Sequence, residues 1–390
     1  MRLLVVVAAS GVIGVGTLAA GPLARVMQAA QDGAAAPALP MPNPAPAYGG
    51  RLLAPSGFTI TEYAKVSGAR FMAQGPDGTV YVSVPGRGLV MRVAAAAADG
   101  HPARVERVLE GQSLPHGLAF HGGWLYVANT DVVVRVKLDA RGIPAGASER
   151  TGASYDAAGG HFTRTVVFGP DSAMYVTVGS SCNLCVEKDS TRATVMRFDA
   201  NGNVGRVFAR GLRNAVGLAV QPTTGALWVT QHERDNLAPS HEDLPPDEVN
   251  ILKDGGDFGW PYCWGQRVPS PEFNDRARCA ATIPPALALQ AHSAPLGMAF
   301  LARATQFPAE YRGDALVAFH GSWNRRTPTG AKIVRLRLVN GKPVSYEDFI
   351  TGWQDANGQR WGRPVDVLVL ADGSVLVSDD DAGLIYRVSH

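Results

Sequence analysis

Polar and mostly cationic residues stand directly ahead of six apolar runs of this 390-residue chain. Arginine pairs with carboxylates, and histidine exchanges a proton near neutral pH, so these residue types suit an anionic ligand and proton transfer. Side chains at one offset in repeated units converge when the units pack around an axis. We therefore predict a positively charged funnel for a small anion, formed by Arg70, His116, His161 with Arg164, Arg213 with Asn214, His292 with Ser293, and Arg363.

Each of these residues also has a structural interpretation. A histidine ahead of a strand often only forms hydrogen bonds, and an arginine at a strand end often pairs with a nearby aspartate or a turn carbonyl. The common register across the six runs favours the convergent site, because independent structural roles would not require it.

The apolar runs belong to a repeat of two strands joined by a short turn that contains Gly or Pro. Successive copies are spaced about 45–60 residues apart, except for one interval lengthened by a long loop, as in repeated sheets arranged radially. The six copies are residues 70–84, 117–129, 165–179, 216–231, 297–319 and 365–380.

This repeat predicts an all-β fold, a six-bladed β-propeller. Each small sheet buries both faces only by stacking on its neighbours, and closing the ring covers the exposed sheets at its ends. Alternating runs such as residues 89–95, 132–138, 194–200 and 332–338 would form the outer strands. Residues 58–66 precede the first copy and would complete the last blade.

The first residues form a separate region. Residues 1–27 hold a charged tip and a long apolar run, which predict a cleaved signal peptide or an N-terminal membrane anchor. Residues 28–50, rich in Ala and Pro, are expected to be a disordered linker, and residues 51–390 the propeller. The folded part is then periplasmic or secreted.

Four cysteines agree with export, and two disulfides are the simplest arrangement. Cys182 and Cys185 are spaced CxxC, which is also compatible with a redox dithiol or half of a zinc site; Val186 in place of His excludes a c-type haem attachment. The chain contains 36 basic and 34 acidic residues, so it has no surplus of positive charge for binding nucleic acid. A small molecule is the expected partner.

Several motifs together resemble the soluble pyrroloquinoline-quinone (PQQ)-dependent sugar dehydrogenases, and among them the sorbosone dehydrogenase branch. The motifs are HFTRTVVFGPDSAMYVTVG, GLRNAVGLAV, PPDEVNILKDGGDFGWP, AHSAPLGMAF and WGRPVDVLVLADGSVLVSDDDAG. The resemblance extends from about Phe58 to the C-terminus, and the fold of that family is also a six-bladed propeller.

The resemblance implies roles for individual residues. His161 matches the catalytic base, and Arg213 with Asn214 matches the pair at the reactive carbonyl of the quinone. Arg164 and Arg363 match cofactor-binding positions, and a further cationic group from the fifth copy corresponds to Arg325 or nearby Lys332. We also expect three further residues to contact the cofactor. His116 and Ser293 belong to the funnel, and His232 follows the second strand of the fourth copy.

Calcium is the second cofactor that the resemblance implies. Family members that oxidise glucose bind it through backbone carbonyls in a Gly-Pro step, where this chain instead reads Gln231-His232-Glu233-Arg234-Asp235. We expect the carbonyls of Glu233 and Arg234 and the carboxylates of Glu233 or Asp235 to serve, since Ca²⁺ prefers oxygen ligands. Asp247 and Glu248 are expected to brace the long loop. A solvated acidic loop is the alternative.

The resulting expectation is a PQQ- and calcium-dependent enzyme that oxidises an aldose or aldehyde sugar to a lactone or acid. His161 would take the hydroxyl proton while hydride passes to the quinone. The chain contains no haem motif, so a separate cytochrome or quinone would accept the electrons. A calcium-dependent lactonase and a non-catalytic sugar-binding propeller are the alternatives.

Overall fold

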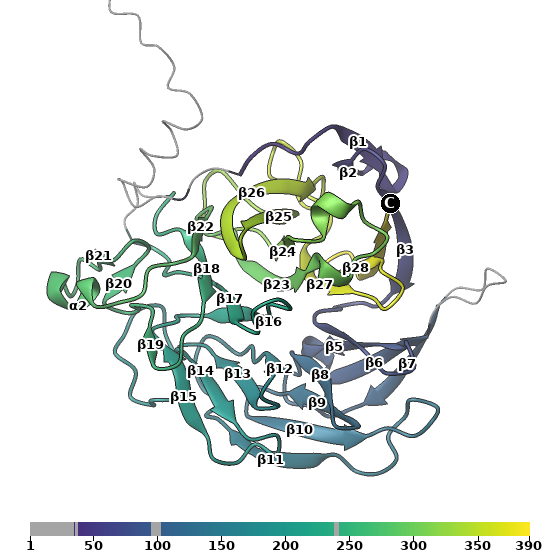
Figure 1. The fold of residues 1–390 in the computed structure, drawn as a ribbon, viewed down its shortest axis with the longest axis horizontal. Coiled ribbons are helices and arrows are strands. Elements are labelled where there is room, and N and C mark those ends of the chain that lie inside the picture. Colours follow the sequence, from purple (N-terminus) through teal and green to yellow (C-terminus); the bar gives the residue numbers. More distant parts are fainter. Residues whose placement is uncertain (1–34, 36–37, 95–102, 238–241) are drawn as a thin grey trace, which may run out of the picture.

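A computed structural model describes residues 35, 38–94, 103–237 and 242–390, and most regular structure in them is β-strand (Figure 1). Six sheets of four or five strands are present, together with two small two-stranded sheets. The innermost strands of the six sheets touch in a closed circle, in the order β4, β8, β12, β16, β23, β27 and back to β4. The predicted six-bladed β-propeller is therefore confirmed.

The first three blades follow the chain without interruption. Blade 1 contains β4 (Met72–Gln74), β5 (Val80–Val84), β6 (Leu89–Ala94) and β7 (Arg104–Leu109). Blade 2 contains β8 (Leu118–His121), β9 (Trp124–Ala128), β10 (Val132–Lys137) and β11 (Glu149–Ser154). Blade 3 contains β12 (Val166–Phe168), β13 (Met174–Val178), β14 (Thr194–Phe198), β15 (Arg206–Arg210) and the short parallel strand β19 (Gly256–Asp257).

The last three blades include the long loop and the ring closure. Blade 4 contains β16 (Ala215–Val220), β17 (Leu227–Gln231), β18 (Asp247–Ile251) and β22 (Leu287–Leu289). Blade 5 contains β23 (Pro295–Phe300), β24 (Ala315–Phe319), β25 (Lys332–Val339) and β26 (Lys342–Ile350). Blade 6 contains β27 (Pro364–Val369), β28 (Val375–Asp379), β29 (Leu384–Ser389) and β3 (Thr59–Lys65), so the early segment completes the last blade as predicted.

Burial changes from the second strand of a blade to its edge. All five residues of β5 and of β13 are buried, because these strands are covered on both faces by the neighbouring blades. The edge strands β3 and β7 instead mix exposed charged residues with buried apolar ones. Apolar clusters consequently lie between adjacent blades, and they hold the ring together.

Glycine permits close approach of the inner strands. A Cβ atom at Gly217 in β16 would lie 2.2 Å from the carbonyl oxygen of Leu296, at β23, and one at Gly297 would lie 2.0 Å from Oδ1 of Asp366 in β27. Any side chain at these positions would push neighbouring blades apart. Pairing of β16 with β17 and of β23 with β24 also shifts register near these glycines, which reorients the residues at the strand start.

The segment ahead of the propeller is more ordered than predicted. Residues 28–50 were predicted to be disordered, yet β1 (Pro44–Ala47) pairs with β2 (Leu52–Pro55), a 3-10 turn spans Tyr48–Gly50, and the Leu39 amide donates to the Tyr346 carbonyl at 2.8 Å. The ring of Tyr48 packs edge-on against Tyr386, 5.0 Å between centroids. These contacts offset the flexibility expected from the composition. Residues 1–27, the predicted leader, and residues 28–34, 36 and 37 of the predicted linker lie outside the described residues.

Two disulfides, Cys182–Cys185 and Cys263–Cys279, use all four cysteines, as predicted. The second one joins the loop that contains β20 (Cys263–Trp264) and β21 (Val268–Pro269) to the helix α2 (Arg276–Ala280). Two disulfides are typical of proteins in oxidising compartments. In the described part of the chain we find no helix with the length and apolar character needed to span a bilayer.

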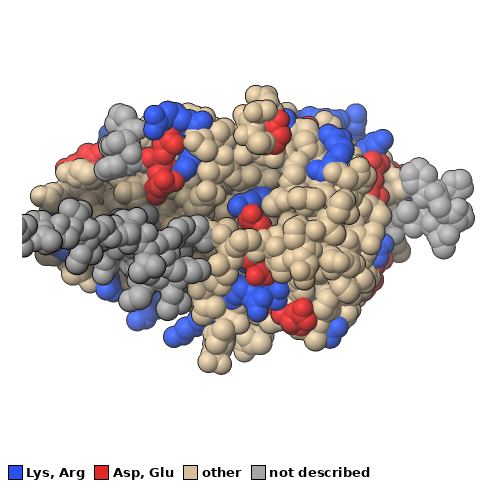
Figure 2. Space-filling view, turned by 90° about the horizontal axis from the view of Figure 1, so that it is seen from above, with Lys and Arg blue, Asp and Glu red and all other residues tan. Residues whose placement is uncertain are grey.

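Charged residues are mixed over the surface. Figure 2 shows Lys and Arg side chains next to Asp and Glu side chains on one face, with no extended area of a single sign. Exposed pairs such as Arg206–Asp254 and Arg197–Asp171 contribute to this pattern.

Candidate active site

A cavity of about 190 Å³ lies where blades 3, 4 and 5 present the beginnings of their inner strands. Its walls come from the segments before β12, β16 and β23, from the loops after β17 and β24, and from the first residue of β18. The lining residues are His161, Arg213, Asn214, His232, Glu233, Asp235, Asp247, His292, Ala294 and Trp323.

Three other hollows are larger, about 410 Å³, 660 Å³ and 230 Å³. The first lies among the β4–β5 and β8–β9 turns, the second beside β19 and the segment after β18, and the third between Pro55 and Tyr311. None of the three gathers histidines with buried carboxylates. We therefore regard the smaller cavity as the candidate site, because groups with perturbed acidity converge there.

His161 has a fixed tautomer. Its Nδ1 lies 2.9 Å from both the carbonyl oxygen and Oγ of Ser180, and that hydroxyl donates its own proton to the Cys182 carbonyl at 2.7 Å. Both neighbours of Nδ1 thus act as acceptors, so Nδ1 carries the proton and Nε2 keeps its lone pair. Burial, and then the nearby Arg213 charge, lower the pKa of His161 to about 4. At neutral pH the side chain is a neutral base.

Arg213 is held on all sides by the protein. Nε donates to the Asn183 carbonyl (3.0 Å), Nη1 to the carbonyls of Glu233 (2.8 Å) and His232 (3.4 Å), and Nη2 to Asn183 Oδ1 (2.9 Å) and Asp235 Oδ2 (3.2 Å). Burial lowers the pKa of its guanidinium, and the Asp235 charge opposes that shift. Arg213 is therefore a rigid cation in the cavity wall, with its donors engaged by the chain.

Asn214 presents an acceptor without a partner. His232 Nε2 donates to the Pro295 carbonyl at 2.9 Å, so its Nδ1 can accept from Asn214 Nδ2 at 3.3 Å. Burial lowers the pKa of His232 to about 3, which keeps it neutral. Asn214 Oδ1 is buried and has no hydrogen bond within the described residues. An unpaired buried oxygen is costly, so a donor or a cation from a ligand would be favoured beside it.

Carboxylates form the other wall. Asp247 accepts from the Glu233 amide at 3.1 Å and from the Ala294 amide at 3.0 Å, so it braces the loop as predicted. Burial raises the pKa of Asp247 to about 8 and also raises that of Glu233. Asp235 bonds to Arg213 and to Asn324 Nδ2 (3.0 Å). The neighbouring residues do not neutralise all of the carboxyl groups in this wall.

Six predicted site residues do not line this cavity. His116 is fully buried against Phe71, 4.1 Å between ring centroids, and Arg164 is fully buried with hydrogen bonds to main-chain carbonyls. The others form hydrogen bonds or ion pairs elsewhere: Arg234 with Glu272, Ser293 with Gln290 and Thr329, Arg325 with Asp243, and Arg363 with the carbonyls of His320 and Gly321. The side chains of all six are engaged by these other partners and do not line the cavity.

Three lining residues, Asp247, Ala294 and Trp323, were not predicted as site residues, and His292 was predicted only as part of the funnel. Asp247 begins β18 after a long loop, so spacing along the chain does not reveal that it meets Glu233. Trp323 is 74% exposed beside the cavity, in the segment HGSWNRR. In the sequence, the signal that could have pointed to this residue was a tryptophan among polar residues.

A propeller with a neutral histidine, an arginine and buried carboxylates at one mouth defines a class of small-molecule enzymes and binding proteins. The family profile described as TrAA12-like matches residues 53–390. The chain belongs to this family, and the resemblance to PQQ-dependent sugar dehydrogenases is confirmed at family level. The sorbosone dehydrogenase branch stays a prediction.

Two curated relatives illustrate the family. An uncharacterised protein of Borreliella burgdorferi is 32% identical over 56% of this chain and 57% of its own length. A PQQ-dependent pyranose dehydrogenase of Coprinopsis cinerea is 27% identical over 58% of this chain and 39% of its own length. The alignments thus span less than two thirds of these relatives.

Solved structures share the fold. The holo form of the PQQ domain of the Coprinopsis cinerea pyranose dehydrogenase matches with a TM-score of 0.73 at 24% identity, covering 90% of this chain and 98% of that one. The calcium structure of a family AA12 enzyme from Trichoderma reesei matches with a TM-score of 0.77 at 21% identity, with the same coverage.

Proposed function

We propose that this protein is a PQQ- and calcium-dependent dehydrogenase that oxidises an aldose or aldehyde sugar, glucose- or sorbosone-like, to a lactone or acid. The observation that carries the proposal is His161: a half-buried, neutral imidazole beside the Arg213 charge, whose Nε2 has no hydrogen bond within the described residues. Family membership and the names of the relatives support the same chemistry. Export to the periplasm or beyond, and an external cytochrome or quinone as electron acceptor, complete the proposal.

The cavity residues offer oxygen ligands to a hard cation, although no three of its carboxylate and imidazole groups have ligand atoms within 4.8 Å of one another in the described residues. Glu233, Asp235 and Asp247 offer carboxylate oxygens, Asn214 Oδ1 lacks a partner, and the raised pKa values of Glu233 and Asp247 reflect buried negative charge without enough compensation. A divalent ion would favour the ionised carboxylates. The Glu233 carbonyl already accepts from Arg213. We therefore propose side-chain oxygens ahead of the carbonyls of Glu233 and Arg234 as calcium ligands.

For an anionic quinone the cavity lining offers the Arg213 charge, and the cavity volume of about 190 Å³ lies below the usual range for ligand sites of about 300–1,000 Å³. A larger cofactor would also meet residues outside the cavity, and Trp323, which is 74% exposed, is available to it. Arg363 donates to the His320 and Gly321 carbonyls, in the loop that carries Trp323, but does not line the cavity. Bound PQQ supplies a two-electron acceptor.

In the proposed reaction, the residues of this chain move a proton or stabilise a charge. His161 accepts the proton of the sugar hydroxyl at Nε2, while Ser180 holds the Nδ1 proton and so keeps the ring oriented. Arg213 places a positive charge where negative charge develops on the acceptor. Because its donors are engaged, Arg213 acts through its fixed field or by exchanging the Asp235 contact.

Calorimetric titration of PQQ into the purified protein, with calcium and then with a chelator, tests this proposal. We expect one equivalent to bind only with calcium, and Arg213→Ala to weaken binding at least about tenfold. Arg206→Ala, which removes an exposed arginine on the outside of blade 3, is the control and should bind as the parent does. Absence of binding in both conditions would reject the PQQ assignment.

A calcium-dependent lactonase is the second candidate, and the cavity gives it specific support. Such an enzyme needs carboxylate and amide side chains around the axis, and Glu233, Asp235, Asp247 and Asn214 provide them. Hydrolysis of a sugar lactone by the PQQ-free, calcium-loaded protein would favour this candidate. Sugar-dependent dye reduction that requires added PQQ would favour the dehydrogenase.

A further inference from the structure

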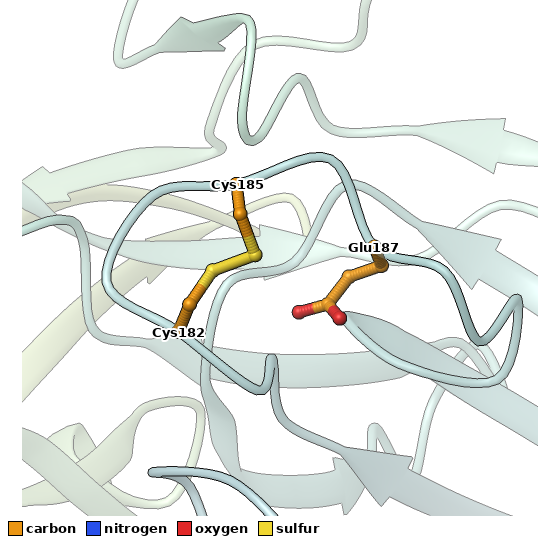
Figure 3. Close-up of side chains that lie close together, drawn as sticks. All are labelled: Cys182, Cys185 and Glu187. Atoms are coloured by element: carbon orange, nitrogen blue, oxygen red, sulfur yellow. A yellow bond between two sulfur atoms is a disulfide. The ribbon is translucent and has the colours of Figure 1, made fainter.

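The loop that follows β13 contains a small covalent ring. The Cys182–Cys185 disulfide closes a turn of four residues, with Asn183 and Leu184 inside it, and Glu187 approaches from the next part of the loop (Figure 3). Glu187 accepts from the Ser181 amide at 2.6 Å and from the Ser181 hydroxyl at 2.8 Å. The ring is thus fixed from both sides. Its sulfurs are bonded to each other, so they are not thiolate ligands for zinc.

Asn183 within this ring connects three parts of the candidate site. Its carbonyl accepts from Arg213 Nε at 3.0 Å and from the indole nitrogen of Trp260 at 3.3 Å. Its Oδ1 accepts from Arg213 Nη2 at 2.9 Å and from the Asp235 amide at 2.8 Å, while its Nδ2 donates to the Asp235 carbonyl at 3.0 Å. One residue of blade 3 therefore holds an arginine and an aspartate that belong to blade 4.

The same turn also supports His161. Ser180 accepts the Nδ1 proton of His161 and donates to the Cys182 carbonyl at 2.7 Å. The main chain of the disulfide ring thus bonds directly to Arg213 and reaches His161 through Ser180, and the proposed function assigns both groups to chemistry.

The ring matters because Asn183 is exposed. Hydrogen bonds of an exposed side chain compete with water, and each flexible backbone residue adds about 1–2 kcal/mol of ordering entropy. A covalent ring restricts the turn before any of these hydrogen bonds form, so less entropy is lost when Asn183 engages Arg213 and Asp235. Without it, an exposed asparagine would hold the pair only part of the time.

We propose that Asn183, held in place by the Cys182–Cys185 disulfide, is a positioning residue that sets Arg213 and Asp235 in the cavity wall. The catalytic meaning of this inference rests on the proposed function, but the geometric claim does not. It can therefore be tested in the cofactor-free protein.

Three protons report on the two acceptors of Asn183 and can be followed by ¹⁵N-resolved NMR exchange with water. The Asp235 amide reports on Oδ1, and the Arg213 Nε proton and the Trp260 indole proton report on the carbonyl. Loss of single resonances in Arg213→Lys and Trp260→Phe assigns the latter two.

The variants separate the side chain from the ring. In Asn183→Ala, exchange of the Asp235 amide should accelerate at least about tenfold, while the two protons on the carbonyl change little. Asn183→Asp retains Oδ1 and should restore protection of the Asp235 amide. In Cys182→Ser/Cys185→Ser all three protons should exchange faster. Val186→Ala, in the same loop but outside the ring, should leave all three unchanged.

Unchanged exchange of the Asp235 amide in Asn183→Ala would overturn the role of Asn183, and unchanged exchange of all three protons in the serine pair would overturn the role of the disulfide. If the serine pair does not fold, mild reduction of the folded parent protein gives the same comparison. Once PQQ binding is established, Asn183→Ala should lower kcat about tenfold with little change in KM for the sugar, and Asn183→Asp should recover kcat. Failure of PQQ to bind would leave the exchange results standing.

Discussion

At the scale of single residues, the site depends on histidines that are kept neutral. Burial lowers the pKa of His161 to about 4 and that of His232 to about 3. Each ring also donates one proton to a main-chain carbonyl, of Ser180 and Pro295 respectively. The two rings nevertheless differ, because His232 Nδ1 faces Asn214, whereas His161 Nε2 has no hydrogen bond within the described residues. Of these two histidines, only His161 is therefore free to accept a proton from a ligand.

Replacement of His161 by alanine should lower kcat by ~10²- to 10⁴-fold, since a positioned general base contributes about that much. PQQ affinity should change less than about tenfold, because His161 carries no charge that pairs with the cofactor. Steady-state kinetics with a dye acceptor, together with calorimetry of PQQ binding, measure the two effects. Equal losses in turnover and in cofactor affinity would contradict the assignment of His161 as a base.

At the scale of elements, the inner strands set the geometry of the mouth. Glycines at equivalent places let β16 approach β23 and let β23 approach β27, and the strand pairing shifts register beside them. Arg213 and Asn214 directly precede β16, so their positions depend on that packing. Replacement of Gly217 should therefore lower the stability of the ring.

Gly217→Ala should destabilise the fold by about 3 kcal/mol, because the new Cβ would lie 2.2 Å from the Leu296 carbonyl oxygen and neither backbone can yield easily. Gly146→Ala is the matched control: its Cβ would meet nothing within 4 Å, so the change should stay within about 0.5 kcal/mol. Urea unfolding followed by circular dichroism compares the two variants. Similar free energies of unfolding for both would contradict the packing argument.

The strands were predictable because each copy repeats one pattern of apolar run, turn and apolar run, and the period alone indicates blades. The site was predictable in part. Arg213, Asn214 and His161 stand next to strand starts, where sequence position determines location. Asp247 and Trp323 reach the cavity through loops of irregular conformation, and no periodicity places them. His116 and Arg164 share the register of the funnel but lie under it, because register does not determine which way a side chain points.

At the scale of the whole molecule, the seam between blades 6 and 1 closes the ring. The Met72 amide donates to Asp366 Oδ2 at 2.8 Å, Arg70 pairs with Asp380 at 2.6 Å, and Ser378 Oγ donates to the Arg70 carbonyl at 2.6 Å. Burial raises the pKa of the Asp366 carboxyl to about 7. The seam therefore contains a group that is protonated near pH 5 and ionised near pH 8.

The sign of the pH effect follows from this shift. In the unfolded chain Asp366 titrates near ~3.9, so the folded state holds the extra proton between that value and about 7, and the associated stability is lost as the pH rises through 7. Asp366→Asn removes the titration and keeps an acceptor for the Met72 amide. Relative to the parent, the variant should gain at most about 3 kcal/mol in free energy of unfolding between pH 5 and pH 8. An equal difference at both pH values, measured by urea unfolding, would contradict this account.

The pairing of β3 with β29 also has a consequence for the timing of biosynthesis. Thr59–Lys65 leaves the ribosome about 300 residues before its partner Leu384–Ser389, so at ~5–20 residues per second β3 waits for some tens of seconds. During that delay its backbone is an open template for other chains. Glu62 and Lys65 along the strand introduce charge that disfavours such pairing. A nascent chain that stops short of β29 would leave β3 in this state permanently, and such fragments should aggregate rather than accumulate as a five-bladed ring.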